Sequence, residues 1–302
     1  MENFDYIIVG AGPAGLSSAV YASRSGLETL VLDSVLLGGQ AMQITDLENY
    51  PGVFPSINGL DFMENMKKQA IQFGAKVKIG NVLSIDKNNG KFIIKTKNEV
   101  YSSICLLIAT GAIHRNLDIP GEKQFVGRGV SYCAICDGPF FRNKKIVVVG
   151  GGDSACSEAT YLSTISKDIK IIHRRNEFRA QKAVVDKMLA SGVVPIYNSI
   201  VKSVNGTNKV ESILVENVTN HTVSSIETDA VFVFTGMIPQ VSLIENLQKD
   251  EYGYILANEK METSVEGLFV AGDVRSKSFR QIITAASDGA VAADSAGKYV
   301  RK

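Results

Sequence analysis

Short apolar runs alternate with glycine turns and helix-like stretches along the chain. Phe4 to Val9 is an apolar run that ends in the glycine-rich segment 10–15 (GAGPAG), and apolar residues then recur at helical spacing up to Arg24. This order predicts a strand, a tight turn and a helix. A second apolar run, Thr29 to Asp33, follows and predicts the next strand of a βαβ unit.

The same pattern occurs again in the second half of the chain. Lys145 to Val149 is apolar and runs into the segment 150–155 (GGGDSA), a helix-like stretch up to Ser163, and another apolar run, Ile169 to His173. Each half also contains a later apolar run that closes on Thr-Gly, at 106–111 and 231–236. The duplication predicts an α/β protein with two Rossmann-like, three-layer dinucleotide-binding domains.

Each glycine turn has the composition that binding of a pyrophosphate requires. The first glycine permits the tight turn, the second lets the backbone approach the phosphates, and the third position must be small so that the helix packs on the strand. The N-terminus of the helix then offers unpaired N–H groups and a partial positive charge. Glycines can also merely tighten a connection between a strand and a helix, but two copies at matched spacing favour nucleotide binding.

The two halves differ at the residue that reads the adenosine ribose. Asp33 ends the second strand of the first half, and an acid there accepts hydrogen bonds from free hydroxyl groups, which suits FAD or NAD. The equivalent place in the second half carries His173, Arg174 and Arg175, with Arg179 close behind. Guanidinium groups pair with phosphate oxygens, so this half suits NADP. A solvated basic turn is the alternative for these arginines.

Composition and charge narrow the class of protein. The 302 residues are 45% hydrophobic and 21% charged with a net charge of +1, which indicates a globular chain of about two domains and argues against nucleic-acid binding. No apolar run reaches the roughly 18 residues of a membrane span, and the acidic start lacks the basic region of a secretory signal. We therefore expect a cytoplasmic protein that neither binds a membrane nor carries a disulfide scaffold.

A close cysteine pair is the strongest chemical signal. Cys133 and Cys136 are separated by two residues and followed at once by Asp137. This spacing lets the sulfurs meet and commonly lowers the pKa of one thiol. Zinc is the alternative, but Cys105 and Cys156 lie in apolar surroundings and His114, His173 and His221 are scattered, so we expect no metal site. Cys105 and Cys156 are expected to be inert buried residues, and His114 and His221 to lie in loops or hairpins.

Together these segments resemble the low-molecular-weight, bacterial-type thioredoxin reductases. The resemblance extends from Phe4 to about Tyr299, and its most specific part is the cysteine pair with Asp137 inside the second nucleotide fold. Two positions depart from the family pattern: Asp33 replaces a common Glu, and Gln240 replaces a usual Asn. The motifs that carry the resemblance are GAGPAG at 10–15, GGQ at 38–40, ENYPG at 48–52, ATG at 109–111, CAICDG at 133–138, GGGDSA at 150–155, HRRNEFR at 173–179, and GLFVAGDVR with RQ within 267–281.

The resemblance implies a homodimeric flavoenzyme that passes electrons from NADPH through FAD and the cysteine pair to the disulfide of thioredoxin. It assigns Cys136 to the flavin side and Cys133 to the protein partner, and Asp137 can exchange the proton that disulfide opening requires. Asp137 can equally be a simple turn residue. Because 267–299 carries FAD-type signals, the FAD domain is expected to be discontinuous, at 1–116 and 244–302, with the NADPH domain inserted at 117–243. The two crossings, near Arg115 and at 241–246, are expected to act as hinges.

The expected cofactor contacts follow from the motifs. For FAD they are Gly10, Gly12, Pro13, Ala14, Gly15, Asp33, Gly39, Gln40, Asn49, Ala109, Thr110, Gly111, Gly272, Asp273, Arg280, Gln281 and Ile282. For NADPH they are Gly150, Gly152, Asp153, Ser154, Ala155, His173, Arg174, Arg175 and Arg179. Some of these residues could be ordinary caps of a strand, turn and helix.

Other functions account for only part of this pattern. An alkyl hydroperoxide reductase flavoprotein resembles this chain in its C-terminal portion, but it carries an N-terminal thioredoxin-like extension, whereas the first glycine turn here begins at residue 10. A flavin-dependent ferredoxin–NADP reductase of the same fold lacks the cysteine pair. A nonreactive dinucleotide sensor would explain the glycine turns but not the pair. A glutaredoxin-like protein remains open as the partner.

Overall fold

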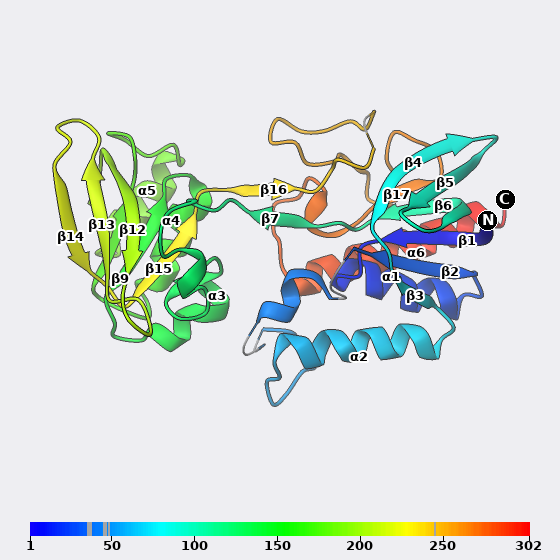
Figure 1. The fold of residues 1–302 in the computed structure, drawn as a ribbon, viewed down its shortest axis with the longest axis horizontal. Coiled ribbons are helices and arrows are strands. Elements are labelled where there is room, and N and C mark those ends of the chain that lie inside the picture. The colour runs from blue at the N-terminus through cyan, green and yellow to red at the C-terminus, as the bar shows by residue number, and fades with distance from the viewer. Residues whose placement is uncertain (35–37, 45–46, 48, 245) are drawn as a thin grey trace. The chain divides into compact units, whose positions relative to one another are not determined.

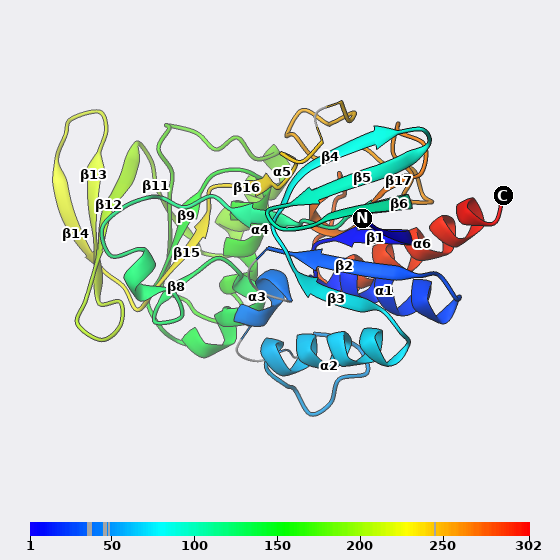
Figure 2. The ribbon, with the colours of Figure 1, turned by 45° about the vertical axis from the view of Figure 1, so that its right-hand side comes forward.

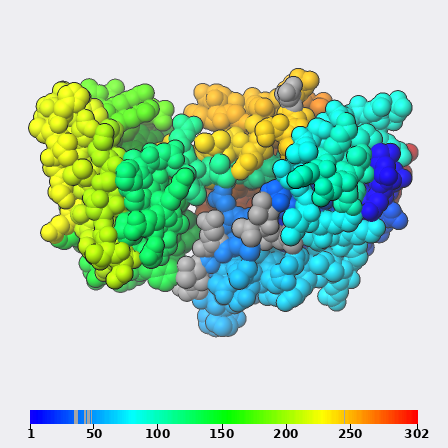
Figure 3. All heavy atoms as spheres, in the orientation of Figure 1, coloured from blue at the N-terminus to red at the C-terminus, as the bar shows by residue number. Residues whose placement is uncertain are grey.

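The computed structural model describes residues 1–34, 38–44, 47, 49–244 and 246–302, and the others are grey in Figure 3. Glu48 of the expected ENYPG motif and Glu245 of the second expected crossing lie outside the described residues. The chain separates into two compact units, one of residues 1–113 and 238–302 and one of residues 114–237. The expected limits of the inserted domain were 117 and 243.

The first unit is built on a seven-stranded sheet covered by helices (Figure 1). Strands β3, β2, β1, β6 and β17 are parallel, and β4 and β5 extend the sheet antiparallel beside the first half of β6. The elements are β1 (Glu2–Val9), α1 (Pro13–Arg24), β2 (Thr29–Asp33), η1 (Gly39–Gln43), α2 (Gly59–Gln72), β3 (Lys76–Ile79), β4 (Val82–Asn88), β5 (Lys91–Thr96), β6 (Val100–Ile108), β17 (Leu268–Val270), η4 (Gly272–Val274) and α6 (Ile282–Val300).

The parallel strands are buried on both faces, as their unbroken apolar runs require. One apolar cluster joins the sheet to α1, α2 and α6, and a second lies on the opposite face around Ile7, Leu30 and Leu106. The antiparallel pair β4–β5, visible beside β6 in Figure 2, was not expected. Asn89 and Gly90 connect these strands with positive φ angles of 49° and 78°, and an Asn-Gly pair is a strong hairpin signal in a sequence.

The second unit has a five-stranded parallel sheet in the order β11-β10-β9-β15-β8 and a separate antiparallel sheet, β12-β13-β14. The antiparallel sheet was not expected either. The elements of the second unit are η2 (Lys123–Phe125), β8 (Val130–Ser131), α3 (Ala134–Asp137), η3 (Gly138–Phe141), β9 (Ile146–Gly150), α4 (Asp153–Leu162), β10 (Ile169–Ile172), α5 (Lys182–Ala190), β11 (Val194–Ile196), β12 (Ser199–Asn205), β13 (Ser212–Asn217), β14 (Val223–Glu227) and β15 (Ala230–Phe234).

The two segments that connect the units pair as a short ribbon, β7 (Ala112–His114) with β16 (Met237–Pro239).

Both units contain the predicted strand, glycine turn, helix and strand. The α/β class with two Rossmann-like folds is therefore confirmed. Among the described residues, no helix combines the length and apolar character needed to cross a membrane.

Candidate functional site

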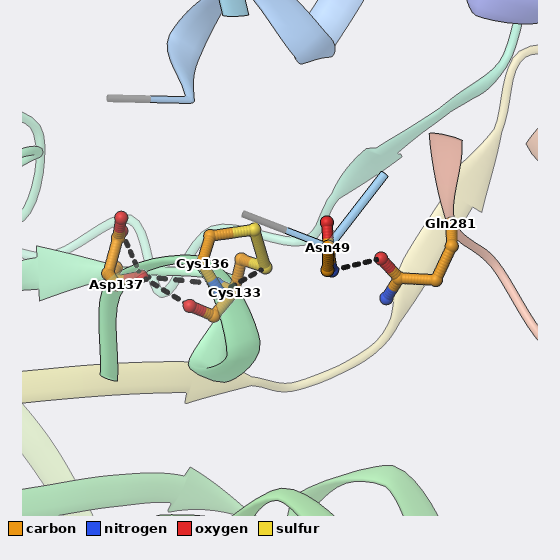
Figure 4. The surroundings of a disulfide bond; sticks show 6 residues. Asn49, Cys133, Cys136, Asp137 and Gln281 are labelled. Carbon is orange, nitrogen blue, oxygen red and sulfur yellow. Dashed lines mark hydrogen bonds between the residues drawn. A yellow bond between two sulfur atoms is a disulfide. The ribbon is translucent and has the colours of Figure 1, made fainter. Parts of the chain in front are cut away.

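The cysteine pair lies on a short helical turn of the second unit. Strand β8 leads into Cys133, which precedes the four-residue helix α3 (Figure 4). Cys133 and Cys136 form a disulfide, with their Cα atoms 5.3 Å apart. The backbone N–H of Cys136 donates a hydrogen bond of 3.2 Å to Sγ of Cys133. Because a donor stabilises negative charge on sulfur, this contact favours a thiolate on Cys133 after reduction.

Asp137 ends the same helical turn and is half-buried (Figure 4). Ser131 Oγ donates a hydrogen bond of 2.6 Å to Asp137 Oδ2 and accepts one of 3.1 Å from the backbone N–H of Cys133. Burial raises the pKa of the Asp137 carboxyl above its ordinary value, and the bond from Ser131 opposes that shift. The turn that carries the disulfide thus also carries a carboxyl with increased proton affinity. Ser131 was missed because a serine two residues before a cysteine carries no signal of its own.

The first glycine turn is shaped by close backbone contacts. A Cβ at Gly10 would lie 2.3 Å from the carbonyl oxygen of Ala109, and one at Gly15 only 1.8 Å from that of Gly10. Gly10 also has a φ of +109°, which strongly favours glycine. In contrast, a Cβ at Gly12 would meet nothing within 4 Å, and no side chain caps α1 at this residue. Open space therefore lies where a pyrophosphate would approach the helix.

Other expected FAD contacts gather around the start of α1. A Cβ at Gly39 would lie 3.4 Å from Cα of Gly12, and one at Gly272 would lie 2.9 Å from Cβ of Ala14. Thr110, two residues after β6, donates a hydrogen bond of 2.6 Å from Oγ1 to the carbonyl of Gln240. Pro13 is the first residue of α1, and Gly111 adopts a φ of +71°. The fold therefore brings η1, the segment after β6, and η4 to one place.

Several polar side chains in this region have partners inside the protein. Asp33 accepts hydrogen bonds from the backbone N–H groups of Ala11 at 2.8 Å and Ser34 at 2.7 Å. Gln40 donates from Nε2 to the carbonyl of Ala112. Asn49 donates from Nδ2 to Oε1 of Gln281 at 3.2 Å, which joins two of the expected FAD contacts directly (Figure 4).

The turn η4 and the start of α6 carry unsatisfied polar atoms. Oδ1 of Asp273 is buried without a hydrogen bond, and burial raises the pKa of this carboxyl. Nε of Arg280 also lacks a partner, and its guanidinium lies 4.0 Å from the centre of the Tyr254 ring. Gln281 caps α6 in a reciprocal arrangement with Thr284, and Ile282 begins the helix. A buried carboxylate oxygen without a donor is what a missing hydroxyl-bearing ligand would leave.

The second glycine turn is bound to the basic segment that follows β10. Nδ1 of His173 lies 2.9 Å from the carbonyl oxygen of Gly150, and the backbone N–H of Arg179 donates to the carbonyl of Gly151 at 2.8 Å. Asp153 Oδ1 accepts from the backbone N–H of Gln181 at 2.7 Å. Burial lowers the pKa of His173, a residue that is only 6% exposed. His173 is therefore buried against the second glycine turn and contacts its backbone.

Gly152 repeats the features of Gly12. A Cβ there would meet nothing within 4 Å, and no side chain caps α4, whereas a Cβ at Gly150 would lie 2.5 Å from Cβ of Ala155. Gly151, which the sequence did not single out, must be glycine because a Cβ would lie 2.0 Å from the His173 ring. Asp153 and Ser154 are exposed at the start of the helix.

The arginines of the basic segment are free to bind an anion. Arg174, Arg175 and Arg179 are all exposed, and no ion pair between described residues includes them. A solvated basic turn would look the same, so their role stays a prediction.

The remaining cysteines lie away from solvent. Cys105 on β6 and Cys156 on α4 are fully buried, and burial raises their thiol pKa values to about 12 and about 11. Such thiols are poor nucleophiles at neutral pH. His114 ends β7, where it stacks on Tyr132, and His221 lies in the turn before β14. In the described part of the chain, no cluster of three or more His, Cys, Asp or Glu side chains could hold a metal ion.

Known proteins resemble this chain over nearly its whole length. The sequence model of the pyridine nucleotide-disulphide oxidoreductase family matches residues 4–289. The thioredoxin reductase of Treponema pallidum is 50% identical over 99% of this chain and 97% of its own, and that of Bacillus subtilis is 43% identical over 99% and 95%. The crystal structure of thioredoxin reductase from Streptococcus pyogenes is 39% identical, with a TM-score of 0.90 over 99% of this chain and 98% of that one. The chain therefore belongs to the pyridine nucleotide-disulphide oxidoreductase family, and within it to the thioredoxin reductases.

Proposed function

We propose that this protein uses NADPH and FAD to reduce its Cys133–Cys136 disulfide and passes the electrons to the disulfide of thioredoxin. The observation that carries the proposal is the disulfide on a half-buried helical turn with the Asp137 carboxyl beside it. Family membership supports the same cofactors and the same partner. We assign catalytic roles to Cys133, Cys136 and Asp137.

The two glycine turns fit the two nucleotides. Gly12 and Gly152 each face open space at an uncapped helix start, as a pyrophosphate requires. In the first unit, the buried Oδ1 of Asp273, which has no hydrogen bond and lies 3.4 Å from Nζ of Lys277, fits a ligand that carries hydroxyl groups. In the second unit, the exposed Arg174, Arg175 and Arg179 fit a 2′-phosphate. When bound, the pair of cofactors supplies hydride transfer and the two electrons that open a disulfide.

The chain's own residues complete the exchange. Opening the disulfide takes two electrons and two protons and gives two thiols, and we assign one of these protons to the carboxyl of Asp137, whose pKa burial raises. The Cys133 thiolate, stabilised by the N–H of Cys136, attacks a sulfur of the partner disulfide and forms a mixed disulfide. Cys136 then attacks Cys133 Sγ, which releases the partner as a dithiol and restores the starting disulfide.

We assign FAD to the unit of residues 1–113 and 238–302 and NADPH to the unit of residues 114–237. We also propose that the protein acts in the cytoplasm as a homodimer, and that the crossings near Arg115 and Val241 allow the units to rotate. These three statements rest on the family resemblance and on the position of the disulfide within the second unit.

An anaerobic titration tests the proposed function. The purified yellow protein is titrated with NADPH, and thiols are trapped with iodoacetamide before and after thioredoxin is added. We expect NADPH to bleach the flavin absorbance, one dithiol to become alkylated at Cys133 and Cys136, and oxidised thioredoxin to restore the colour. Reoxidation by a glutaredoxin but not by thioredoxin would assign the other partner. A flavin that NADPH does not bleach would overturn the proposal.

A further inference from the structure

A cluster of buried charges lies behind the turn η4 of the first unit. The side chains of Lys277, Asp288 and Arg275 are only 9%, 12% and 16% exposed. Burial of a charge is costly unless it is paired and hydrogen-bonded, so each of these groups needs its neighbours. Arg275 ends the motif GLFVAGDVR, whereas Lys277 and Asp288 carry no signal of their own in the sequence. Arg275 and Lys277 lie in the loop after η4, and Asp288 lies on α6.

Asp288 is the centre of this cluster. Its Oδ2 accepts hydrogen bonds of 3.1 Å from the backbone N–H of Gly272 and from Nζ of Lys277, and its Oδ1 accepts one of 3.0 Å from Nη1 of Arg275. The next residue, Gly289, packs against α1 so closely that a Cβ there would lie 2.0 Å from the carbonyl oxygen of Ala14. Asp288 therefore fastens the turn η4 to the part of α6 that contacts the first turn of α1.

Lys277 links Asp288 to Asp273. Its Nζ donates to Oδ2 of Asp288 and to Oγ1 of Thr284 at 3.3 Å, and lies 3.4 Å from Oδ1 of Asp273. At that distance the ammonium pairs with the Asp273 charge, but Oδ1 has no hydrogen bond and stays available to a ligand. Asp288 thus competes with Asp273 for the same ammonium group.

We propose that Asp288 is a positioning residue for FAD, which keeps Lys277 from closing on Asp273 and holds the Gly272–Asp273 turn in a binding-competent shape. The inference rests on the proposed function, since Asp273 is one of the proposed FAD contacts. Without the Asp288 charge, Lys277 would satisfy Oδ1 of Asp273, and the acceptor that the flavin nucleotide needs would be occupied. Replacement of Asp288 by asparagine removes the charge with little change in shape.

The test measures the dissociation constant for FAD on the full-length protein stripped of flavin. We expect Asp288→Asn to weaken FAD binding at least tenfold while the dissociation constant for NADPH changes less than twofold. Asp294→Asn is the matched control, because Asp294 lies on the same helix in an exposed pair with Lys298 at 2.6 Å. It should change FAD binding less than twofold.

A second pair of variants keeps the test decisive if Asp288→Asn does not fold. Lys277→Met should bind FAD within threefold of the wild type, and adding it to Asp288→Asn should restore FAD binding, because no ammonium then remains to close on Asp273. Circular dichroism confirms that each flavin-free variant is folded at the temperature of the titration. Wild-type FAD affinity in folded Asp288→Asn, or FAD binding at least fivefold weaker in folded Lys277→Met, would overturn the inference. Failure of the wild-type protein itself to bind FAD would instead overturn the proposed function.

Discussion

The hydroxyl group of Ser131 donates a hydrogen bond of 2.6 Å to Oδ2 of Asp137, and this bond ties the acid beside the disulfide to the strand that leads into Cys133. Burial raises the pKa of Asp137, and the donor opposes that shift because it stabilises the charged form. The hydrogen bond from Ser131 thus limits how far burial raises the pKa of Asp137.

Ser131→Ala should move the pH dependence of disulfide opening toward higher pH. Loss of the donor raises the pKa of Asp137, so the carboxyl stays protonated, and able to donate, at a pH where the wild-type group has ionised. The measurement is the rate of reoxidation of the reduced flavin by the internal disulfide across the pH range. Asp137→Asn should remove this pH-dependent limb in both backgrounds. An unshifted limb in Ser131→Ala would show that Asp137 is not the group that titrates.

Cys133→Ser and Cys136→Ser should each abolish thioredoxin reduction but leave the flavin reducible by NADPH. Hydride transfer precedes disulfide opening, so the first half-reaction does not need either sulfur. Steady-state turnover and anaerobic flavin bleaching separate the two steps. Cys156→Ala is the control, because this thiol is fully buried with a pKa raised to about 11. Full turnover in either serine variant would contradict the mechanism.

Replacement of Arg174, Arg175 or Arg179 by glutamine should lower kcat/KM for NADPH and leave that for NADH nearly unchanged. A hydrogen bond to a charged group contributes about 1.5 to 3 kcal/mol, which corresponds to roughly 10- to 100-fold per arginine. Lys187→Gln removes an exposed positive charge at the end of α5 in the same unit and controls for net charge. An equal loss for both cofactors would mean that the arginines serve the fold.

Gly12→Ala and Gly152→Ala should separate binding of the two nucleotides. A methyl group at either position meets nothing within 4 Å in the protein, so the fold should tolerate it, but it would occupy space that a pyrophosphate needs. We expect Gly12→Ala to weaken FAD binding and Gly152→Ala to weaken NADPH binding, each at least tenfold by titration. Gly15→Ala should instead destabilise the protein, because its Cβ would lie 1.8 Å from a carbonyl oxygen. If each variant weakened both nucleotides equally, the assignment of one nucleotide to each unit would be wrong.

The sequence by itself determined the two nucleotide folds and the redox pair. Strand β2 occupies the predicted residues 29–33, and β9, α4 and β10 lie within a residue or two of the predicted segments. These features are visible in a sequence because local spacing produces them: apolar runs form buried strands, glycines permit the turns, and two intervening residues bring Cys133 and Cys136 together.

Only the tertiary structure decided which other residues contact the predicted site residues and hold them in place. Asp288 and Lys277 look like ordinary helix and loop residues in the sequence, and they meet because α6 packs against α1 and η4 turns back onto it. Ser131 can bond to Asp137 because the chain turns back through α3. The close contact between Gly151 and the His173 ring arises because the second glycine turn packs against the segment after β10. Such pairs depend on how the chain turns and packs in three dimensions, which leaves no periodic pattern along the sequence.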